Sequence, residues 1–136
     1  MSAPVIRASG DEVIFSVRFE NFSPDRSYRI GFGAKGEAVP DVQVALSNED
    51  RDLPLEPMDF SQGNTKGWWK IEQVGARGYT IGKSEIPEAG KALTFKVTVP
   101  RDVADNYDKV YLFVSRDYGS GRWYLEDGSE IDKSDW

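Results

Sequence analysis

The sequence predicts an all-β fold, an antiparallel β-sandwich of the jelly-roll or immunoglobulin-like kind with about eight or nine strands. Three observations lead to this prediction. Apolar and polar residues alternate with a period of two over most of the chain, as in strands that bury one face. The seven prolines and thirteen glycines fall mostly between the alternating runs, where they mark turns. No window of helical length keeps apolar residues at helical spacing without an interrupting glycine or proline.

The clearest alternating run is 13–20, in which Val13, Phe15, Val17 and Phe19 share one face of a predicted strand. The same alternation predicts further strands at 28–32, 42–46, 93–99 and 123–125, with shorter candidates at 5–8, 68–74 and 79–81. The run 109–116 is apolar on both faces, which indicates a central strand that is covered on both sides. The stretch 48–66 is the least regular, and we expect long loops there.

A chain of 136 residues is long enough for one domain, since two domains would leave each with a marginal core. We therefore expect a single sandwich domain over 1–128. The last segment, 129–136, is predicted to be an acidic C-terminal tail or an edge strand. The chain shows no internal repeat and no low-complexity linker.

The composition excludes much familiar chemistry. Cysteine and histidine are both absent, which removes disulfides, thiol catalysis, imidazole bases and metal sites built on these residues. With 17 basic and 23 acidic residues the formal net charge is −6, which argues against a nucleic-acid partner. No apolar run approaches the roughly 20 residues that a membrane-spanning helix needs, so no membrane partner is expected. We expect no cofactor, and nothing in the sequence demands more than a monomer.

The first residues, Met1 to Val5, lack the charged and apolar regions of a signal peptide. This indicates either a cytoplasmic protein or a module taken from a longer secreted protein. We expect the second case, an extracellular bacterial module, and the absence of oxidisable thiols is compatible with it.

Two adjacent tryptophans, Trp68 and Trp69, are the first candidate binding residues. Neighbouring residues of a strand point to opposite faces, so only one of the two indoles can enter the core. The other either packs beneath the 48–66 loops or presents a flat apolar face to a ligand. An exposed indole suits a sugar, because the C–H groups of a pyranose stack on the ring while its hydroxyls reach polar neighbours.

A second aromatic cluster follows a glycine-rich turn at 119–121. It contains Trp123 and Tyr124, which point to opposite sides of the predicted last strand, so one ring is expected to be buried. Asp117 and Arg122, together with Arg116, are the polar groups that complete a stacking and hydrogen-bonding subsite. Trp136 is a further candidate platform, although terminal residues are often poorly ordered.

The acidic residues give no specific signal. Asp102, Asp105 and Asp108 recur every three residues but lack the pattern of a calcium loop, so we interpret them as a solvated surface turn. A structural calcium ion is compatible with a sandwich of this kind, but the sequence does not place one. A glycosidase needs two carboxylates flanking the scissile bond in a cleft, and one small sandwich offers little material for a cleft. We therefore expect no enzymatic activity.

These aromatic pairs, on a chain of this size and strand pattern, resemble the β-sandwich carbohydrate-binding modules appended to plant-polysaccharide hydrolases. The resemblance is carried by Trp68, Trp69, Trp123 and Tyr124, with Gln73, Asp117 and Arg122 among the polar companions. It implies a non-catalytic module that binds a neutral glycan such as β-glucan, xyloglucan, xylan or mannan, within a larger multi-domain glycoside hydrolase. The acidic net charge disfavours a polymer of uronic acids, whose carboxylates would be repelled.

Two other functions remain open from the sequence. An immunoglobulin-like structural or protein-interaction module would use its tryptophans mainly in the core. A small acidic inhibitor or immunity protein would cover a basic partner with its acidic surface.

Overall fold

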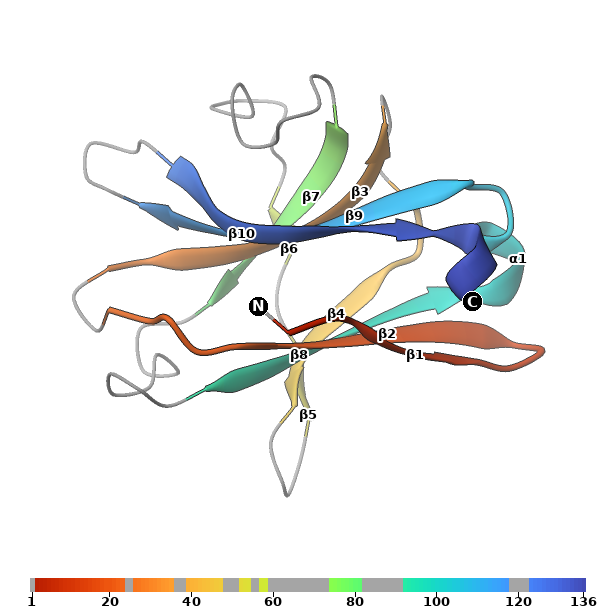
Figure 1. Cartoon of the computed structure of the whole chain (residues 1–136), viewed down its shortest axis with the longest axis horizontal. Helices are drawn as coiled ribbons and strands as arrows, with labels where there is room; N and C mark the ends of the chain where they lie inside the picture. The colour runs from red at the N-terminus through yellow and green to blue at the C-terminus, as the bar shows by residue number, and fades with distance from the viewer. Residues whose placement is uncertain are drawn as a thin grey trace.

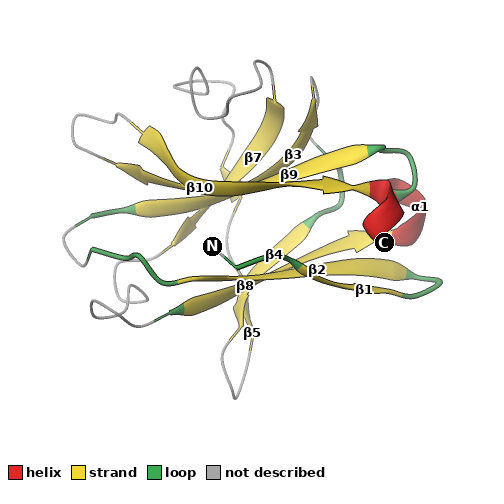
Figure 2. Ribbon diagram, in the orientation of Figure 1, coloured by secondary structure: helices red, strands yellow, loops and turns green. Residues whose placement is uncertain are grey.

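The computed structural model describes residues 2–23, 26–35, 39–47, 52–54, 57–58, 74–81, 92–117 and 123–136. At positions 35, 52–53, 57–58, 74–80, 117 and 123–125 it describes the backbone and not the side chain. Strands dominate this part of the chain, and the helical segments are one short helix and a terminal 3₁₀ turn at the same end of the molecule (Figure 2).

Ten strands of the described chain form two antiparallel sheets that face each other (Figure 1). The first sheet has the order β1-β2-β8-β4-β5 and is made of β1 (Val5–Ala8), β2 (Glu12–Phe19), β8 (Leu93–Pro100), β4 (Gln43–Ser47) and β5 (Asp52–Pro54). The second sheet has the order β10-β9-β3-β7-β6 and is made of β10 (Trp123–Asp132), β9 (Lys109–Asp117), β3 (Tyr28–Lys35), β7 (Val74–Ile81) and β6 (Pro57–Met58). The predicted antiparallel β-sandwich is confirmed.

The strand order is that of an immunoglobulin-like sandwich with an insertion. Strands β1, β2, β8 and β4 take the places of A, B, E and D, and β10, β9 and β3 take those of G, F and C. The chain between β4 and β8 adds β5 to the edge of the first sheet and β6 and β7 to the edge of the second. Two strand predictions need correction here. The stretch 74–81 is one strand, because Gly75 and Gly78 continue the ladder with β3, and the predicted loop 48–66 contains β5 and β6.

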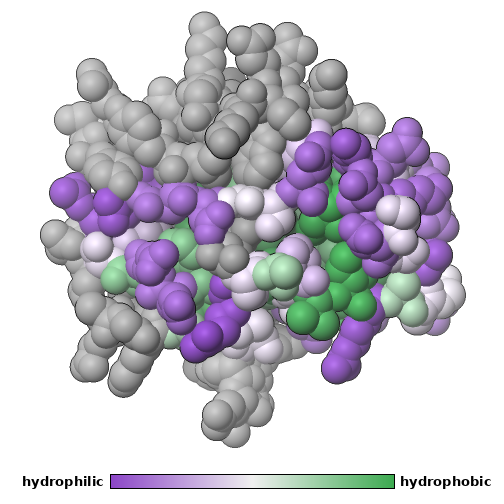
Figure 3. Space-filling model, viewed as in Figure 1, coloured by the Kyte–Doolittle hydropathy of each residue, from purple (hydrophilic) through white to green (hydrophobic). Residues whose placement is uncertain are grey.

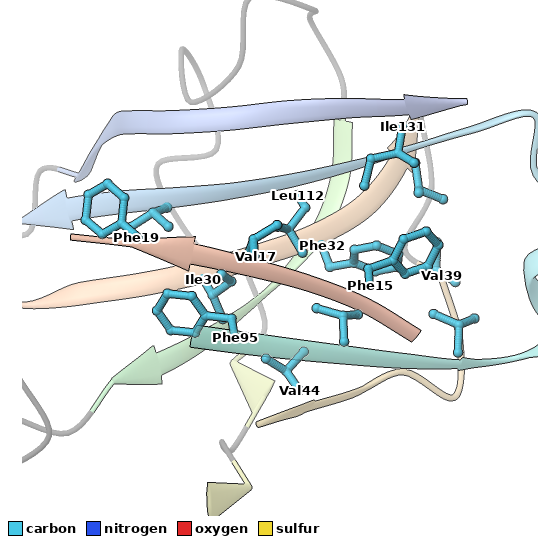
Figure 4. Packing of buried hydrophobic residues seen from close by; sticks show 14 of the residues in the cluster. Phe15, Val17, Phe19, Ile30, Phe32, Val39, Val44, Phe95, Leu112 and Ile131 are labelled. Carbon is cyan, nitrogen blue, oxygen red and sulfur yellow. The ribbon is translucent and has the colours of Figure 1, made fainter. Parts of the chain in front are cut away.

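The core lies between the sheets and follows the predicted alternation. The inward residues of β2 are almost completely buried, and Phe15, Val17 and Phe19 lie in the packing seen in Figure 4. They meet Ile30 and Phe32 of β3 and Leu112 of β9 from the opposite sheet. The run 109–116 is covered on both sides as predicted: Val110, Leu112 and Val114 join the core, and Tyr111 and Phe113, on the other face, are also buried.

The connection from β8 to β9 crosses between the sheets through a single helical turn, α1 (Arg101–Ala104). Arg101 fixes this turn to the β1–β2 connection, since its backbone N–H donates to the carbonyl of Asp11 and its side chain donates to that of Ser9. The 3₁₀ helix Lys133–Asp135 follows β10 at the same end (Figure 2). We call this end of the sandwich the α1 end, and the opposite end, where β9 ends and β10 begins, the hairpin end.

Candidate functional site

The structure describes only part of the predicted site. Trp68, Trp69, Gln73 and Arg122 lie outside the described residues. Asp117, Trp123 and Tyr124 belong to β9 and β10, where their backbone is described but not their side chains.

The register brings three of the predicted residues together at the hairpin end. Trp123 is the cross-strand partner of Asp117, and Tyr124 is the partner of Arg116. Directly opposed residues of an antiparallel pair lie roughly 4.5–5.5 Å apart. Position 117 is two residues after Ser115 and four after Phe113, so these positions share the outer face of the second sheet. Position 124 belongs with Arg116 to the opposite, core-side set.

Strand β7 begins at the other end of the second sheet. β7 begins at Val74, opposite Lys35, whereas Arg116 and Ile81 both lie opposite Tyr28 at the start of β3. The seven-residue step from Tyr28 to Lys35 corresponds to roughly 24 Å of strand. The start of β7 directly follows the predicted residue Gln73 in the sequence. The register places this start far from the rung of Asp117 and Trp123.

The aromatic rings whose side chains are described are structural. Six of them lie in the core, and the pairs among Phe15, Phe19, Phe22, Tyr28 and Phe32 pack with centroids 4.8–6.4 Å apart. Among the described side chains the one large hydrophobic that is exposed is Val5, at 63%. An aromatic platform, if the chain has one, must come from residues such as Trp68, Trp69, Trp123 and Tyr124.

Trp136 is partly buried and packs against the core. Its indole meets the ring of Phe15 edge to face, with centroids 5.6 Å apart and an interplanar angle of 87°. Its backbone N–H donates to the carbonyl of Lys133, which closes the 3₁₀ turn. The structure thus gives Trp136 a packing role at the α1 end instead of the predicted ligand platform.

A partly buried polar cluster lies beside the rung formed by Asp117 and Trp123. Arg116 forms an ion pair with Glu126, with Nε and Oε1 2.9 Å apart and both side chains 20% exposed. The Nη1 group of Arg116 donates to Ser23 Oγ at 3.3 Å. The backbone N–H of Ser23 in turn donates to the hydroxyl of Tyr28 at 2.6 Å. Arg116, which the sequence offered as a ligand-contacting group, is therefore engaged within the fold.

The outer face of the second sheet is built from small residues around Phe113. Gly31 of β3 and Gly128 of β10 are its cross-strand partners, and Gly78 follows Gly31 across to β7. A Cβ atom at Gly31 would overlap the ring of Phe113, so the glycine leaves the space in which the ring lies. Phe113 is 2% exposed and offers no open ring face to a ligand.

On the outer face of β9, Ser115 lies between Phe113 and Asp117. Its cross-strand partners are Arg29 on β3 and Leu125 on β10. The hydroxyl is fully buried and has no hydrogen-bond partner in the described part of the chain. A buried hydroxyl without a partner is uncommon in folded proteins.

A second cross-strand cluster lies towards the α1 end of the same two strands. Lys109 Nζ lies 3.2 Å from Glu130 Oε1 and 3.7 Å from Asp132 Oδ1, and the Tyr111 hydroxyl donates to Glu130 Oε1 at 3.3 Å. The hydrogen bond and the charge of Glu130 raise the pKa of Lys109. Burial raises the pKa of Tyr111, and the negative charge of Glu130 adds to this effect.

Acidic residues gather at the α1 end. Eight exposed carboxylates lie there, namely those of Asp11, Glu12, Asp102, Asp105, Asp108, Glu130, Asp132 and Asp135. The described basic side chains beside them are Arg101, Lys109 and Lys133. Hydrophilic residues cover this end in the space-filling view (Figure 3). Among the described side chains, acidic groups therefore outnumber basic groups at this end.

Asp102, Asp105 and Asp108 are all exposed, and Asp105 pairs with Arg101 at 3.1 Å. Across the described ranges no three acidic, histidine or cysteine side chains come together in a way that could hold a metal ion.

Comparison with known proteins returns no match to a family model, a curated protein or a solved structure. Among the described helical segments none is long and apolar enough to cross a membrane.

The sequence did not reveal the pairing of Arg116 with Glu126. Ten residues separate the two, and their meeting depends on an irregularity in β10 that has no signature in the alternation of residues. Ser115 was missed for a related reason, because a lone serine in an apolar strand gives no sign of whether its hydroxyl finds a partner.

Proposed function

We propose that the protein is a non-catalytic carbohydrate-binding module that recognises a neutral plant cell-wall polysaccharide, such as β-glucan, xyloglucan, xylan or mannan. The observation that carries this proposal is the cross-strand pairing of Trp123 with Asp117 at the hairpin end. It puts Trp123 and Asp117 on one rung of the sheet, between β9 and the edge strand β10.

The chemistry of this pair suits a sugar. An indole offers a flat apolar surface to the C–H groups of a pyranose, and each ring of this kind contributes on the order of 1–3 kcal/mol. The adjacent carboxylate is acceptor-only and can receive hydrogen bonds from sugar hydroxyls. Trp68, Trp69, Tyr124, Gln73 and Arg122 are the further ligand-contacting residues of the proposal.

The net charge of −6 supports a neutral ligand, because an acidic chain would repel the carboxylates of a uronic-acid polymer.

We further propose reversible binding without turnover and without a cofactor. The module would act outside the cell, as a monomeric part of a larger multi-domain glycoside hydrolase, with no nucleic-acid or membrane partner. These points rest on the resemblance to such modules and on the composition of the chain.

Native affinity electrophoresis tests the proposal. The purified protein is run through gels that contain xyloglucan, mixed-linkage β-glucan, xylan or mannan, beside Trp123→Ala, Trp68→Ala and Trp69→Ala. We expect retardation by one neutral glycan and its loss in at least one variant that keeps the circular dichroism spectrum of the folded protein. Trp136→Phe is the matched control, because it removes an indole at the α1 end and should leave retardation unchanged.

Two results would contradict the proposal. One is free migration of the folded protein in every gel. The other is retardation that persists in all the tryptophan variants, which would place any binding surface elsewhere.

A second candidate is a protein-interaction module or small acidic inhibitor, favoured by the carboxylates at the α1 end. Binding to a basic partner would then weaken steeply with salt and would fall when Asp102 and Asp108 are replaced by asparagine. These substitutions should leave glycan retardation unchanged, so the two candidate functions are separable.

A further inference from the structure

The strand that carries Trp123 contains a β-bulge. Leu125 pairs with Ser115 and Asp127 pairs with Val114, so Glu126 is an extra residue with no partner of its own in the ladder. Bulges bend a strand and increase its twist, and they often re-aim a nearby side chain. The bulge lies between the long regular part of β10 and the rungs formed by Tyr124 and Trp123.

Local contacts hold both sides of the bulge. On one side the backbone N–H of Gly128 donates to the carboxylate of Asp127 at 2.8 Å. The extra residue itself, Glu126, forms an ion pair with Arg116, with Oε1 and Nε 2.9 Å apart. A regular strand would not contain this extra residue. The bulge therefore supplies the partner that the guanidinium of Arg116 needs in the partly buried end of the sandwich.

Arg116 ties this strand to the rest of the hairpin end. Its backbone belongs to β9, its Nε meets Glu126 of β10, and its Nη1 reaches Ser23 in the β2–β3 connection. Ser23 is fixed in turn by the hydroxyl of the fully buried Tyr28. One side chain thus joins β9, β10 and the β2–β3 connection.

We propose that the Arg116–Glu126 ion pair is a positioning device for the proposed ligand site. The inference rests on the proposed function. Arg116 is the cross-strand partner of Tyr124 and directly precedes Asp117, the partner of Trp123, so the pair borders both rungs that carry predicted ligand residues. Arg116 and Glu126 act through the backbone of these rungs and do not contact the ligand.

The same two strands provide an internal comparison. Lys109 and Glu130 form another ion pair between β9 and β10, with side chains 48% and 41% exposed. That pair lies in the regular part of the ladder, beside no bulge and far from Trp123. Exposed pairs contribute little to structure because water screens them. A pair that is shielded from water and anchored to a third segment restrains geometry more strongly.

The test compares Glu126→Gln with Glu130→Gln. Each replaces a carboxylate by an amide of the same shape in a cross-strand pair of β9 and β10. Dissociation constants are measured by titration calorimetry with an oligosaccharide of the glycan that retards the protein, and unfolding midpoints are measured in urea. We expect Glu126→Gln to weaken binding roughly two- to thirtyfold, the range of modest couplings between sites, and Glu130→Gln to leave it unchanged.

Amide hydrogen exchange gives a readout that needs no ligand. Loss of the positioning pair should speed exchange at the paired amides of residues 123–125 in Glu126→Gln while the amides of β2 and β8 keep their protection. Faster exchange there would support the positioning role even if no glycan were bound, in which case the proposed function alone would fail.

Two outcomes would overturn the inference. The first is wild-type affinity and wild-type exchange at 123–125 in Glu126→Gln. The second is an equal loss in Glu126→Gln and Glu130→Gln, which would show a general effect of charge on the hairpin. Should Glu126→Gln fail to fold, Arg116→Lys takes its place, since it keeps the charge but not the planar fork of donors.

Discussion

The two ends of the sandwich are both closed by an aromatic side chain, but in different ways. At the hairpin end Phe22, 4% exposed, packs edge to face on Phe19 and Tyr28, with centroids 4.8 and 4.9 Å apart. At the α1 end Trp136 packs edge to face on Phe15 but stays partly exposed. The polar contacts differ in the same sense. At the hairpin end the backbone N–H of Ser23 donates to the hydroxyl of the buried Tyr28. At the α1 end the exposed Lys133 side chain donates to the carbonyl of Asp105.

The difference indicates how each end opens. At the hairpin end the aromatic closure is part of the core, so we expect the cluster of Phe19, Phe22 and Tyr28 to open only when the whole sandwich unfolds. The α1 end is held by contacts that can break while the core persists, such as those from Lys133 to the carbonyls of Asp105 and Asp108. We therefore expect the proposed ligand site at the hairpin end to lie beside the more firmly packed of the two aromatic closures.

The largest effect is expected for Phe22→Ala. The substitution removes a buried ring from the aromatic cluster and leaves a cavity beside Phe19 and Tyr28, which should lower the free energy of unfolding by about 3 kcal/mol or more. Urea unfolding followed by circular dichroism measures the change. Val5→Ala is the control, since Val5 is 63% exposed and its loss should stay within about 0.5 kcal/mol.

Trp136→Ala should cost less, about 1–2 kcal/mol, because the indole is only partly buried and its loss opens one end of the core. Hydrogen exchange should quicken at β10 residues near Asp132 and at α1 before any change appears at β2. A loss of stability equal to that of Phe22→Ala, with uniform exchange, would show that both ends open together and would remove the contrast between them.

Most of the fold was predictable because the core depends on alternation. The inward positions of β2 and β8 repeat every two residues without interruption, and all of them are buried except Leu93, which is partly buried. The central position of β9 was also readable, since apolar residues on both faces of a strand require cover on both sides. The continuity of β7 was not, because Gly75 and Gly78 read as turn residues, and only pairing with β3 keeps them in the strand.

The candidate site was less accessible to sequence reasoning. The nearness of Asp117 and Trp123 follows from a hairpin prediction, and the ladder pairs them directly. The bulge at Glu126 depends on a mismatch of one residue between two strands, which no single strand displays. The packing of Trp136 depends on the 3₁₀ turn that returns the chain to Phe15, a tertiary contact with no local signal.

The smallest expected effect is a loss of stability in alkaline solution that begins at the α1 side of the β9–β10 pair. Burial and Glu130 raise the pKa of Tyr111 above its ordinary value, and Glu130 and Asp132 raise the pKa of Lys109. A group whose pKa is higher in the folded state favours folding fully below its unfolded pKa, about 10 for both residues. That contribution is lost as the pH rises through the higher folded pKa, so stability should fall above about pH 10.

Tyr111→Phe separates this effect from general alkaline unfolding. The variant lacks the phenol, so its stability should fall less steeply with pH, and the late-ionising tyrosine should vanish from the ultraviolet titration of the folded protein. Glu126→Gln serves as the control at the hairpin end, because it leaves Tyr111 and Lys109 in place and should keep the wild-type slope. If the stability of Tyr111→Phe falls with pH as steeply as that of the wild type, the alkaline transition has another origin. The expectation that the α1 end opens first as the pH rises would then be wrong.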